Sequence, residues 1–257
     1  MSNISAIGID IGSTTWKAVA IDHEGGIRAS RIEPTDPLID RQTERLLAEL
    51  KAASGADDAV PIVVTGYGRK RVQHLTNRVL TEITCHARGA FFHTNKPGVL
   101  IDIGGQDTKV IHLGPQGDVL DFAMNDKCAA GTGRFLEVIL GRLHVPFDQI
   151  QNRLDDAQKA ITISSTCTVF AESEVVSLVA QGERVGDIVS GLHYSLASRV
   201  AALAGRLAAD VDIFMSGGVS QNAAMVRALG DRLGHPVSVL PEPQLIGALG
   251  AALSARS

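Results

Sequence analysis

The sequence is poor in aromatic residues, which make up 4% of its 257 residues. So few aromatic side chains argue against a stacking platform for nucleic-acid bases. A formal net charge of −4 provides no general attraction to nucleic acid or to an anionic membrane surface. We therefore expect neither nucleic acid nor a membrane as a partner.

Long hydrophobic runs are also missing. The apolar stretch near the N-terminus has no basic residues before it and already contains Asp10, so it does not read as a secretory signal. Arg199 and Arg206 interrupt the alanine-rich stretch near the C-terminus, and no segment reaches the roughly 18 apolar residues that a membrane span requires. These absences predict a cytoplasmic protein.

Cysteine is scarce as well, with three residues that lie far apart in the sequence. This number and spacing do not suit a disulfide framework, and a reducing cytoplasm keeps such residues as free thiols or as ligands. The three are Cys85, Cys128 and Cys167.

The chain carries an internal duplication. The tetrapeptide IDIG at residues 9–12 recurs at residues 101–104, and at the same offset Lys17 aligns with Lys109. Gly25 and Gly117 also align, each in a glycine turn. Each copy begins with a β-branched run, turns, and returns as a second strand, which predicts two related β-hairpin units. The alternative is a chance recurrence of a short apolar word.

The rest of the chain alternates helical and strand patterns, as expected of an α/β protein with sheets covered on their faces. We predict two α/β lobes, residues 1–96 and 97–241, with the C-terminal helix at about 242–257 free to pack back on the first. Helices are predicted at 37–51, 222–233 and 244–254 and near Ala87, Arg134, Glu172 and Leu192; strands are predicted at 60–65, 212–215 and 237–240.

In both copies an aspartate, Asp10 or Asp102, lies at the end of the strand just before a glycine turn. Glycine lets backbone N–H groups approach an anion, hydroxyl side chains add donors, and a nearby carboxylate can hold hydrated magnesium. The pattern predicts a polyphosphate site, with two ordinary glycine hairpins as the alternative. The turns consist of Gly12, Ser13 and Thr14 in the first copy and Gly104, Gly105 and Gln106 in the second.

A third element follows the same logic. The sequence IFMSGGVSQN at residues 213–222 predicts a strand, a turn through Gly217 and Gly218, and a helix capped by Ser220 or Asn222. Such a turn can admit a nucleotide close to the backbone. It is neither a Walker loop nor a dinucleotide fingerprint, because the Gly-Lys-Ser/Thr and G-x-G-x-x-G spacings are absent.

Together these three motifs resemble the two phosphate motifs and the adenosine motif of the actin, sugar-kinase and heat-shock-chaperone ATPases. The resemblance implies a two-lobed actin-like fold, a duplicated ribonuclease-H-like architecture, with an ATP or ADP site between the lobes. It implies that Asp10 and Asp102 hold Mg²⁺ and order the attacking water, while the glycine turns hold phosphates. Lys17 and Gln106 are further candidates for contacts with phosphate or water.

Cys128 and Cys167 each precede a predicted helix, where the positive end of the helix dipole favours a thiolate or an iron–sulfur cluster. Their polar flanks argue for ligands, although both could instead be small buried hydrophobic residues. A cluster normally takes four cysteines, so two chains on a symmetry axis would supply them. Zinc could use the same geometry, but no Cys-x-x-Cys or histidine pair supports it within one chain. Cys85 is expected to be buried, and the eight histidines to be surface or core residues.

With the segments NDKCAAGTGRF (125–135) and CTVFAESE (167–174) included, the chain resembles ATP-dependent activators of 2-hydroxyacyl-CoA dehydratases, which are related to the ATPase subunits of benzoyl-CoA reductases. This resemblance implies a homodimer that shares one [4Fe-4S] cluster through Cys128 and Cys167 of both subunits. It also implies oxygen sensitivity, one-electron transfer from ferredoxin or flavodoxin, and a separate dehydratase or reductase component as acceptor, whose substrate the sequence does not identify.

Two alternatives belong to other functional classes. A small-molecule kinase of the same superfamily, similar to the small pantothenate kinases, would use Asp102 or Asp107 as base and leave both cysteines structural. A nucleotide-dependent assembly module would contain no cluster. Neither alternative explains the polar surroundings of Cys128 and Cys167.

Overall fold

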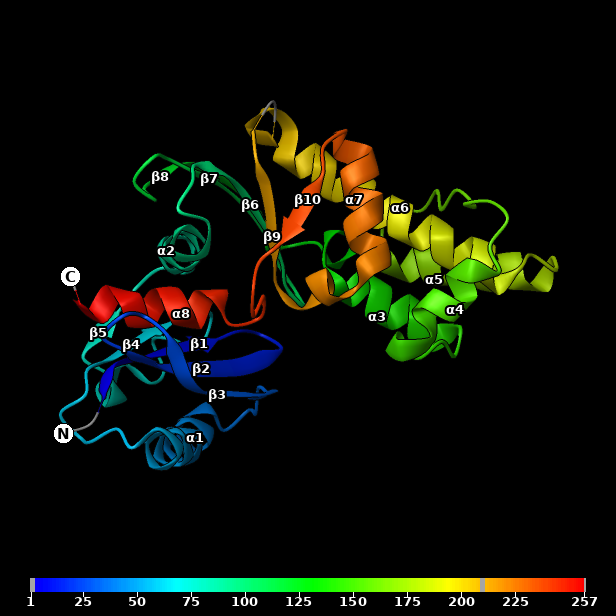
Figure 1. The fold of residues 1–257 in the computed structure, drawn as a ribbon. Helices are drawn as coiled ribbons and strands as arrows, with labels where there is room; N and C mark the ends of the chain where they lie inside the picture. Colours follow the sequence, from blue (N-terminus) through cyan, green and yellow to red (C-terminus); the bar gives the residue numbers. More distant parts are fainter. Residues whose placement is uncertain (1–2, 209–210, 257) are drawn as a thin grey trace. The chain divides into compact units, whose positions relative to one another are not determined.

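The computed structural model describes residues 3–208 and 211–256 of the chain, whose fold is drawn in Figure 1. The chain divides into two compact units. Unit 1 comprises residues 1–100, 111–122 and 240–257, and unit 2 comprises residues 101–110 and 123–239. No helix among the described residues has both the length and the apolar character needed to cross a membrane.

Two five-stranded sheets with helices packed on them confirm the α/β class. The first sheet has the strand order β3-β2-β1-β4-β5 and the second has the order β10-β9-β6-β7-β8. The strands are β1 Ile4–Ile11, β2 Thr15–Asp22, β3 Ile27–Pro34, β4 Ile62–Thr65, β5 Arg78–Val79, β6 Gly98–Ile103, β7 Thr108–Leu113, β8 Val119–Asn125, β9 Ile213–Ser216 and β10 Val237–Val239. The helices are α1 Ile39–Ser54, α2 Glu82–Thr94, α3 Gly133–Arg142, α4 Ile150–Asp155, α5 Thr168–Ala180, α6 Val185–Ala204, α7 Ala223–Leu233 and α8 Ile246–Leu253.

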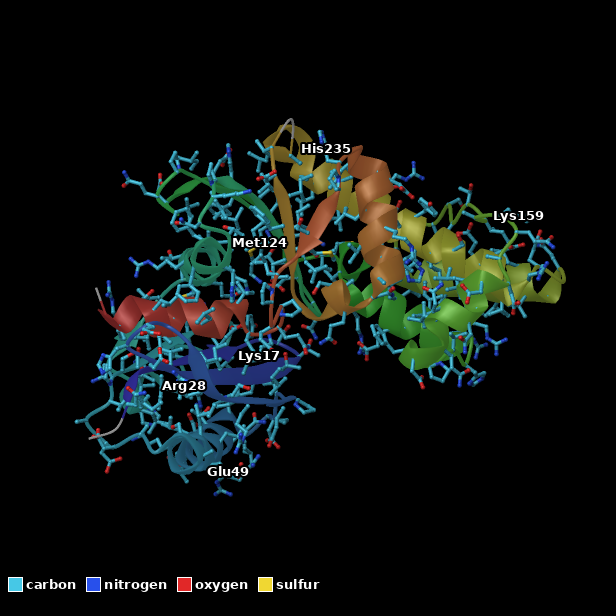
Figure 2. All side chains as sticks on the ribbon, in the orientation of Figure 1. Lys17, Arg28, Glu49, Met124, Lys159 and His235 are labelled. Atoms are coloured by element: carbon cyan, nitrogen blue, oxygen red, sulfur yellow. The ribbon has the colours of Figure 1, made fainter. Side chains whose placement is uncertain are left out.

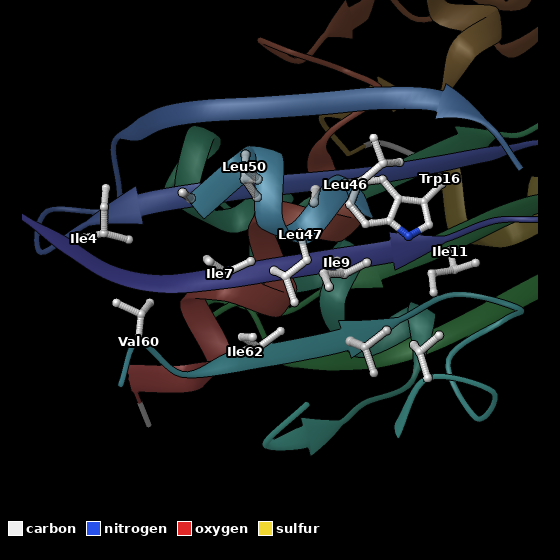
Figure 3. Close-up of a cluster of buried hydrophobic side chains, with 14 residues drawn as sticks. Ile4, Ile7, Ile9, Ile11, Trp16, Leu46, Leu47, Leu50, Val60 and Ile62 are labelled. Carbon is white, nitrogen blue, oxygen red and sulfur yellow. The ribbon is translucent and has the colours of Figure 1, made fainter. Parts of the chain in front are cut away.

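Strand β1 is buried on both faces, which explains why its sequence is almost entirely apolar. The isoleucines on one face, Ile7, Ile9 and Ile11, pack with the leucines of α1 (Figure 3). On the other face Gly8 lies against α8, where a β-carbon would collide with the backbone oxygen of Ala248. Helix α8 therefore packs directly on β1, the strand that carries Asp10.

Helix α8 also packs closely on α2 within unit 1. Two glycines allow this approach, because a β-carbon at Gly89 would meet the carbonyl of Ile246 and one at Gly250 would meet the carbonyl of Cys85. The close contact brings the middle of α2 and the start of α8 to the end of β1.

The structure contains three strands that the sequence pattern did not predict, β3, β5 and β8. Both β3 and β8 follow a glycine turn and extend a predicted hairpin to three strands. Each is an edge or near-edge strand with several exposed residues, so neither has the apolar run that marks a buried strand. The predicted helix at 222–233 is confirmed, and Asn222 caps α7 by accepting hydrogen bonds from the N–H groups of Ala224 and Met225.

Candidate functional site

The first aspartate turn, residues 10–17, joins β1 to β2. Asp10 is buried and pairs in register with Lys17 of β2, which is labelled in Figure 2. The Lys17 Nζ lies 3.5 Å from Asp10 Oδ2. A hydrogen bond of 3.0 Å from the Gly12 N–H to the Thr15 carbonyl closes the turn. Ser13 and Thr14, at the tip, are exposed.

The second aspartate turn, residues 102–109, repeats this geometry between β6 and β7. Lys109 Nζ lies 3.5 Å from Asp102 Oδ2, and the Gly104 N–H donates to the Asp107 carbonyl at 2.9 Å. Lys109 is also 2.6 Å from Asp107 Oδ2, so it lies between two carboxylates. Gln106 is exposed at the tip, beside half-buried Gly105. A sequence duplication thus corresponds to a duplicated Asp–Lys pair.

The third predicted motif lies beside the second turn, in the same unit. Ser216, the last residue of β9, donates a hydrogen bond of 2.7 Å to Asp102 Oδ1. Gly217 follows with φ 86°, and a β-carbon there would lie 2.7 Å from the carbonyl carbon of Ile103. Only glycine fits this close approach without strain. Tertiary packing therefore brings two motifs, 114 residues apart, to one place.

The rest of this motif forms a compact turn. Gly218 begins a short 3-10 helix over Gly218–Gln221, and Ser220 Oγ donates to the Gly217 carbonyl at 2.7 Å. The hydroxyl of Ser220 therefore already has an acceptor within the protein, which makes it a structural element of the turn as well as a candidate ligand contact.

Residues beside Asp10 that the sequence did not single out come from β4, α2 and α8. Gly66, after β4, has φ 93°, and a β-carbon there would lie 2.6 Å from Asp10 Oδ1. A β-carbon at Gly247 would lie 2.8 Å from Asp10 Oδ2 and 2.7 Å from Cε1 of His86. His86 is buried, as a core histidine would be, but its ring lies next to the candidate magnesium ligand. The apolar, hydroxyl, glycine order of Val64, Thr65 and Gly66 was the available signal, because it repeats that of residues 215–217.

The segment that carries Cys128 is hydrogen-bonded to the second aspartate turn. Thr132 Oγ1 donates to the Gly105 carbonyl at 3.0 Å, and the Gly133 N–H donates to the Gly104 carbonyl at 2.9 Å. From the other side, Thr108 Oγ1 donates to the Gly131 carbonyl at 2.7 Å. The backbone that follows Cys128 is thereby fixed to the candidate phosphate turn.

Cys128 and Cys167 are both exposed, so the alternative that they are buried hydrophobic residues is wrong. Cys167 lies immediately before α5, as expected. Cys128 precedes a short 3-10 turn, Ala129–Gly131, and α3 begins only at Gly133, because the Asn125 side chain bonds the N–H and carbonyl of Cys128 and closes a separate loop. The prediction that Cys85 is buried is confirmed, and burial raises the pKa of its thiol to about 12.

One chain alone offers only part of a metal site. In the described ranges, 3–208 and 211–256, no group of three or more His, Cys, Asp or Glu side chains is placed to hold a metal ion. Two exposed thiols do fit a group that is shared with a second chain. Next to Cys167, the hydroxyl of Thr168 is buried without a hydrogen-bond partner among the described residues.

Glu174 of α5 fixes the segment before Cys167. Its carboxylate accepts hydrogen bonds of 2.8 Å from the N–H groups of Ser164 and Ser165 and from the Ser164 hydroxyl. Partial burial alone would raise the pKa of Glu174, but these hydrogen bonds outweigh it and lower the pKa to about 2. Glu174 therefore stays ionised at neutral pH and keeps Cys167 at a defined place.

Comparison with known proteins relates nearly the whole chain to one family. The BadF/BadG/BcrA/BcrD ATPase family matches residues 7–255. The chain is 42% identical to the 2-hydroxyisocaproyl-CoA dehydratase activator of Clostridioides difficile, over 97% of this chain and 94% of that protein. It is 41% identical to the (R)-2-hydroxyglutaryl-CoA dehydratase activating ATPase of Acidaminococcus fermentans, over 98% and 97%. Identity to a benzoyl-CoA reductase subunit of Thauera aromatica is 30%, over 96% and 91%.

Solved structures agree with the expected actin-like architecture. Component A of the (R)-2-hydroxyglutaryl-CoA dehydratase of Acidaminococcus fermentans aligns with a TM-score of 0.91 at 40% identity, covering 97% of this chain and 96% of that one. The Clostridium difficile activator with bound ADPNP aligns at 0.88 and 42% identity, covering 97% and 93%. A ROK family glucokinase from Streptomyces griseus, at 15% identity and a TM-score of 0.61, covers 98% and 99% and shares the fold alone.

Proposed function

The chain belongs to the BadF/BadG/BcrA/BcrD ATPase family, and we propose that it is an ATP-dependent one-electron activator of a 2-hydroxyacyl-CoA dehydratase. The named relatives at 41% and 42% identity are a dehydratase-activating ATPase and a dehydratase activator. Identity to the benzoyl-CoA reductase subunit is lower, at 30%, which favours a dehydratase over a reductase as acceptor. The ROK family glucokinase shares only the fold.

The observation that carries this proposal is the exposure of two of the three cysteines, Cys128 and Cys167, in segments that the same unit holds in place. Two subunits of a homodimer would present four such thiols to one [4Fe-4S] cluster, as many as the group requires. When bound, that cluster supplies a one-electron carrier at the protein surface. Thr168 would donate its free hydroxyl to a sulfur of the group, and the α5 N-terminus would favour its negative charge.

The nucleotide would be held by the two aspartate turns and the Ser216–Ser220 turn. We assign Asp10 and Asp102 to hydrated Mg²⁺, and the backbone N–H groups of the glycine turns, with Ser13 and Thr14, to phosphate. Lys17 is assigned to phosphate, and exposed Gln106 to orienting the attacking water. Bound ADPNP in a 42% identical relative supports a nucleotide site in this chain. The assigned turn residues are Gly12, Gly104, Gly105, Gly217, Gly218 and Ser220.

Nucleotide turnover would be coupled to electron transfer by the hydrogen bonds that join the second turn to the Cys128 segment. A shift of Gly104 and Gly105 would move Thr132 and Gly133, because hydrogen bonds join them directly. Transferring one electron to an acceptor whose potential is about 300 mV lower costs on the order of 7 kcal/mol, since about 59 mV corresponds to about 1.4 kcal/mol for one electron. Nucleotide can drive this shift only if it binds the two conformations with different affinity. Ferredoxin or flavodoxin would supply the electron and the dehydratase would accept it.

Iron analysis and a visible spectrum after strictly anaerobic purification test the proposal. We expect a brown protein that bleaches on reduction, with about four irons per two chains. Cys128→Ala should lose the iron and the colour while it stays folded and still binds ATP. The matched control is Cys85→Ala, which removes a buried thiol and should keep the iron. Wild-type protein that is colourless, free of iron and monomeric under these conditions would contradict the proposal.

A further inference from the structure

A single guanidinium joins the two cysteine segments of one chain. Arg199 lies in α6, and its Nη1 donates to the Ala130 carbonyl at 2.9 Å while its Nη2 donates to the Ser165 carbonyl at 2.8 Å. Ala130 follows Cys128 by two residues, and Ser165 precedes Cys167 by two residues. All of these residues belong to unit 2. The fork of Arg199 thus spans the gap between the segments that carry the exposed thiols.

The position of this guanidinium is well defined. Its central carbon lies 4.5 Å from the centre of the Phe135 ring of α3, a cation–π contact. Arg199 is half-buried, and α6, at 20 residues the longest helix among those described, packs on both α3 and α5. Burial lowers the pKa of Arg199 and the nearby Cys128 opposes this, yet arginine stays charged at neutral pH.

Each cysteine segment is also stiffened on its own side. The Asn125 side chain bonds both the N–H and the carbonyl of Cys128, and Glu174 accepts from the N–H of Ser165. Arg199 therefore connects two local structures that are already ordered. Its planar fork is suited to this task, because two donors point at two separate carbonyls at once. A lysine at this position could satisfy only one of them.

We propose that Arg199 is a positioning residue that sets the distance between Cys128 and Cys167 within one chain. Neither nitrogen of the fork needs to touch the ligated group, because both act through the backbone of the two segments. The consequence for cluster retention rests on the proposed function. The consequence for the distance between the two thiols does not, since it concerns the chain alone.

Spin labels on the two exposed cysteines measure that distance directly. Nitroxide reagents modify Cys128 and Cys167 of the iron-free full chain but not Cys85, whose buried thiol has a pKa of about 12. Labelled chains are diluted with excess unlabelled chains, so that dipolar broadening of the continuous-wave electron resonance spectrum reports the short distances within one chain. We expect a narrow distribution for the wild type, a broader one for Arg199→Met and an intermediate one for Arg199→Lys.

Arg227→Met is the matched control. Arg227 also links two segments of unit 2, by donating to the Gln151 side chain at 3.0 Å, but it is exposed and, within the part of the chain that the structure describes, forms no hydrogen bond or ion pair with either cysteine segment. This variant should keep the wild-type distance distribution. Circular dichroism at the same temperature confirms that each variant is folded. If Arg199→Met does not fold, the distance distribution of Arg199→Lys tests the proposal in its place.

Iron release to a chelator provides a second readout on the anaerobic protein. We expect release about tenfold faster in Arg199→Met than in wild type, because two charge-assisted hydrogen bonds are lost, and unchanged release in Arg227→Met. An unchanged distance distribution in folded Arg199 variants would overturn the proposal. If wild-type protein takes up no iron, the proposed function fails, and the distance measurement still decides the role of Arg199.

Discussion

The two aspartate turns share one plan but differ in how many partners their charged groups have. Lys17 faces Asp10 alone among the ion pairs of the described residues, and its side chain is 17% exposed. Lys109 lies between Asp102 and Asp107, and its side chain is 4% exposed. Thr15 stands where the second copy has Asp107. One copy therefore keeps a lysine that a ligand can reach, whereas the other uses its lysine to brace the turn.

The duplication continues beyond the turns. Gly66 and Gly217 have φ of 93° and 86°, and each lies against the strand that carries the aspartate of its own unit. Each follows a strand, β4 or β9, that neighbours that carrier strand in its sheet. Ser216 donates to Asp102, whereas Thr65 donates to the Leu80 carbonyl. Similar backbones thus serve different side-chain networks, which the following predictions separate.

The largest expected effect is on stability. Lys109→Met removes the cation that two carboxylates share, and it should lower the free energy of unfolding by about 3–5 kcal/mol, because Asp102 remains buried with its charge. Lys17→Met should cost less, because Lys17 pairs with a single carboxylate and its side chain is more exposed than that of Lys109. Urea denaturation of both variants measures the difference. Equal losses would show that the two turns are braced alike.

The next effect is on catalysis. Asp10→Asn should lower magnesium-dependent ATP hydrolysis by about 100-fold, because the amide is a poorer magnesium ligand, while iron content and colour persist. Steady-state hydrolysis and iron analysis of the same preparation check this prediction. Asp102→Asn should lower both hydrolysis and stability, since it also disturbs Lys109 and Ser216. Unchanged turnover in Asp10→Asn would remove Asp10 from the candidate site.

A smaller effect on stability and hydrolysis distinguishes Gly66 from Gly217. Gly217→Ala should cost about 2 kcal/mol, from a positive φ and a β-carbon that meets the Ile103 backbone. Gly66→Ala should cost at least as much and should also impair hydrolysis, because its β-carbon would press on Asp10 Oδ1. Thermal unfolding and ATPase assays distinguish the two. Loss of stability without loss of activity in Gly66→Ala would argue that the Asp10 carboxylate tolerates displacement.

The smallest effect concerns the distal turns of the two hairpins, residues 22–26 and 114–118. Both turns have the same backbone hydrogen bonds, but the aspartate is the first residue of one turn, Asp22, and the last residue of the other, Asp118. A hydrogen bond from the Gly26 N–H lowers the pKa of Asp22, and burial acts in the opposite direction. Further hydrogen bonds from Glu24 and Arg28 also lower the pKa, so that it lies below its ordinary value. A lowered pKa stabilises the fold above the ordinary aspartate value of 3.8, and this contribution is lost as the pH falls below it.

Asp22→Asn should therefore unfold at a lower temperature than wild type at pH 7, and the gap should narrow below about pH 4. Asp118→Asn, at the opposite end of the second distal turn, should show a smaller gap, because from the described residues the Asp118 side chain accepts only a long bond of 3.4 Å, from the Gln116 N–H. A gap for Asp22→Asn that stays constant from pH 7 to pH 3 would show that charge plays no part.

Local patterns were sufficient to predict much of the molecule. The α/β class, the two hairpins and helices α1, α2, α3, α5, α6, α7 and α8 follow from apolar periodicity and glycine turns, which act over a few residues. The exposed or partly exposed edge strands β3, β5 and β8 escaped prediction, because edge strands need fewer apolar residues. The burial of Cys85 was predicted and is confirmed, whereas Thr65 and Gly66 went unnoticed, because their signal spans only three residues.

The chemical inventory can be read from the residues alone: two Asp–Gly turns, a Ser–Gly–Gly turn, and two cysteines in polar segments before helices. Which of these groups meet depends on the packing of distant elements. Glycines at 8, 89 and 250 let backbones approach, and this packing places His86 beside Asp10. The fork of Arg199 likewise joins carbonyls 35 residues apart. Such contacts depend on distances between elements far apart in the chain, and local sequence patterns carry no record of those distances.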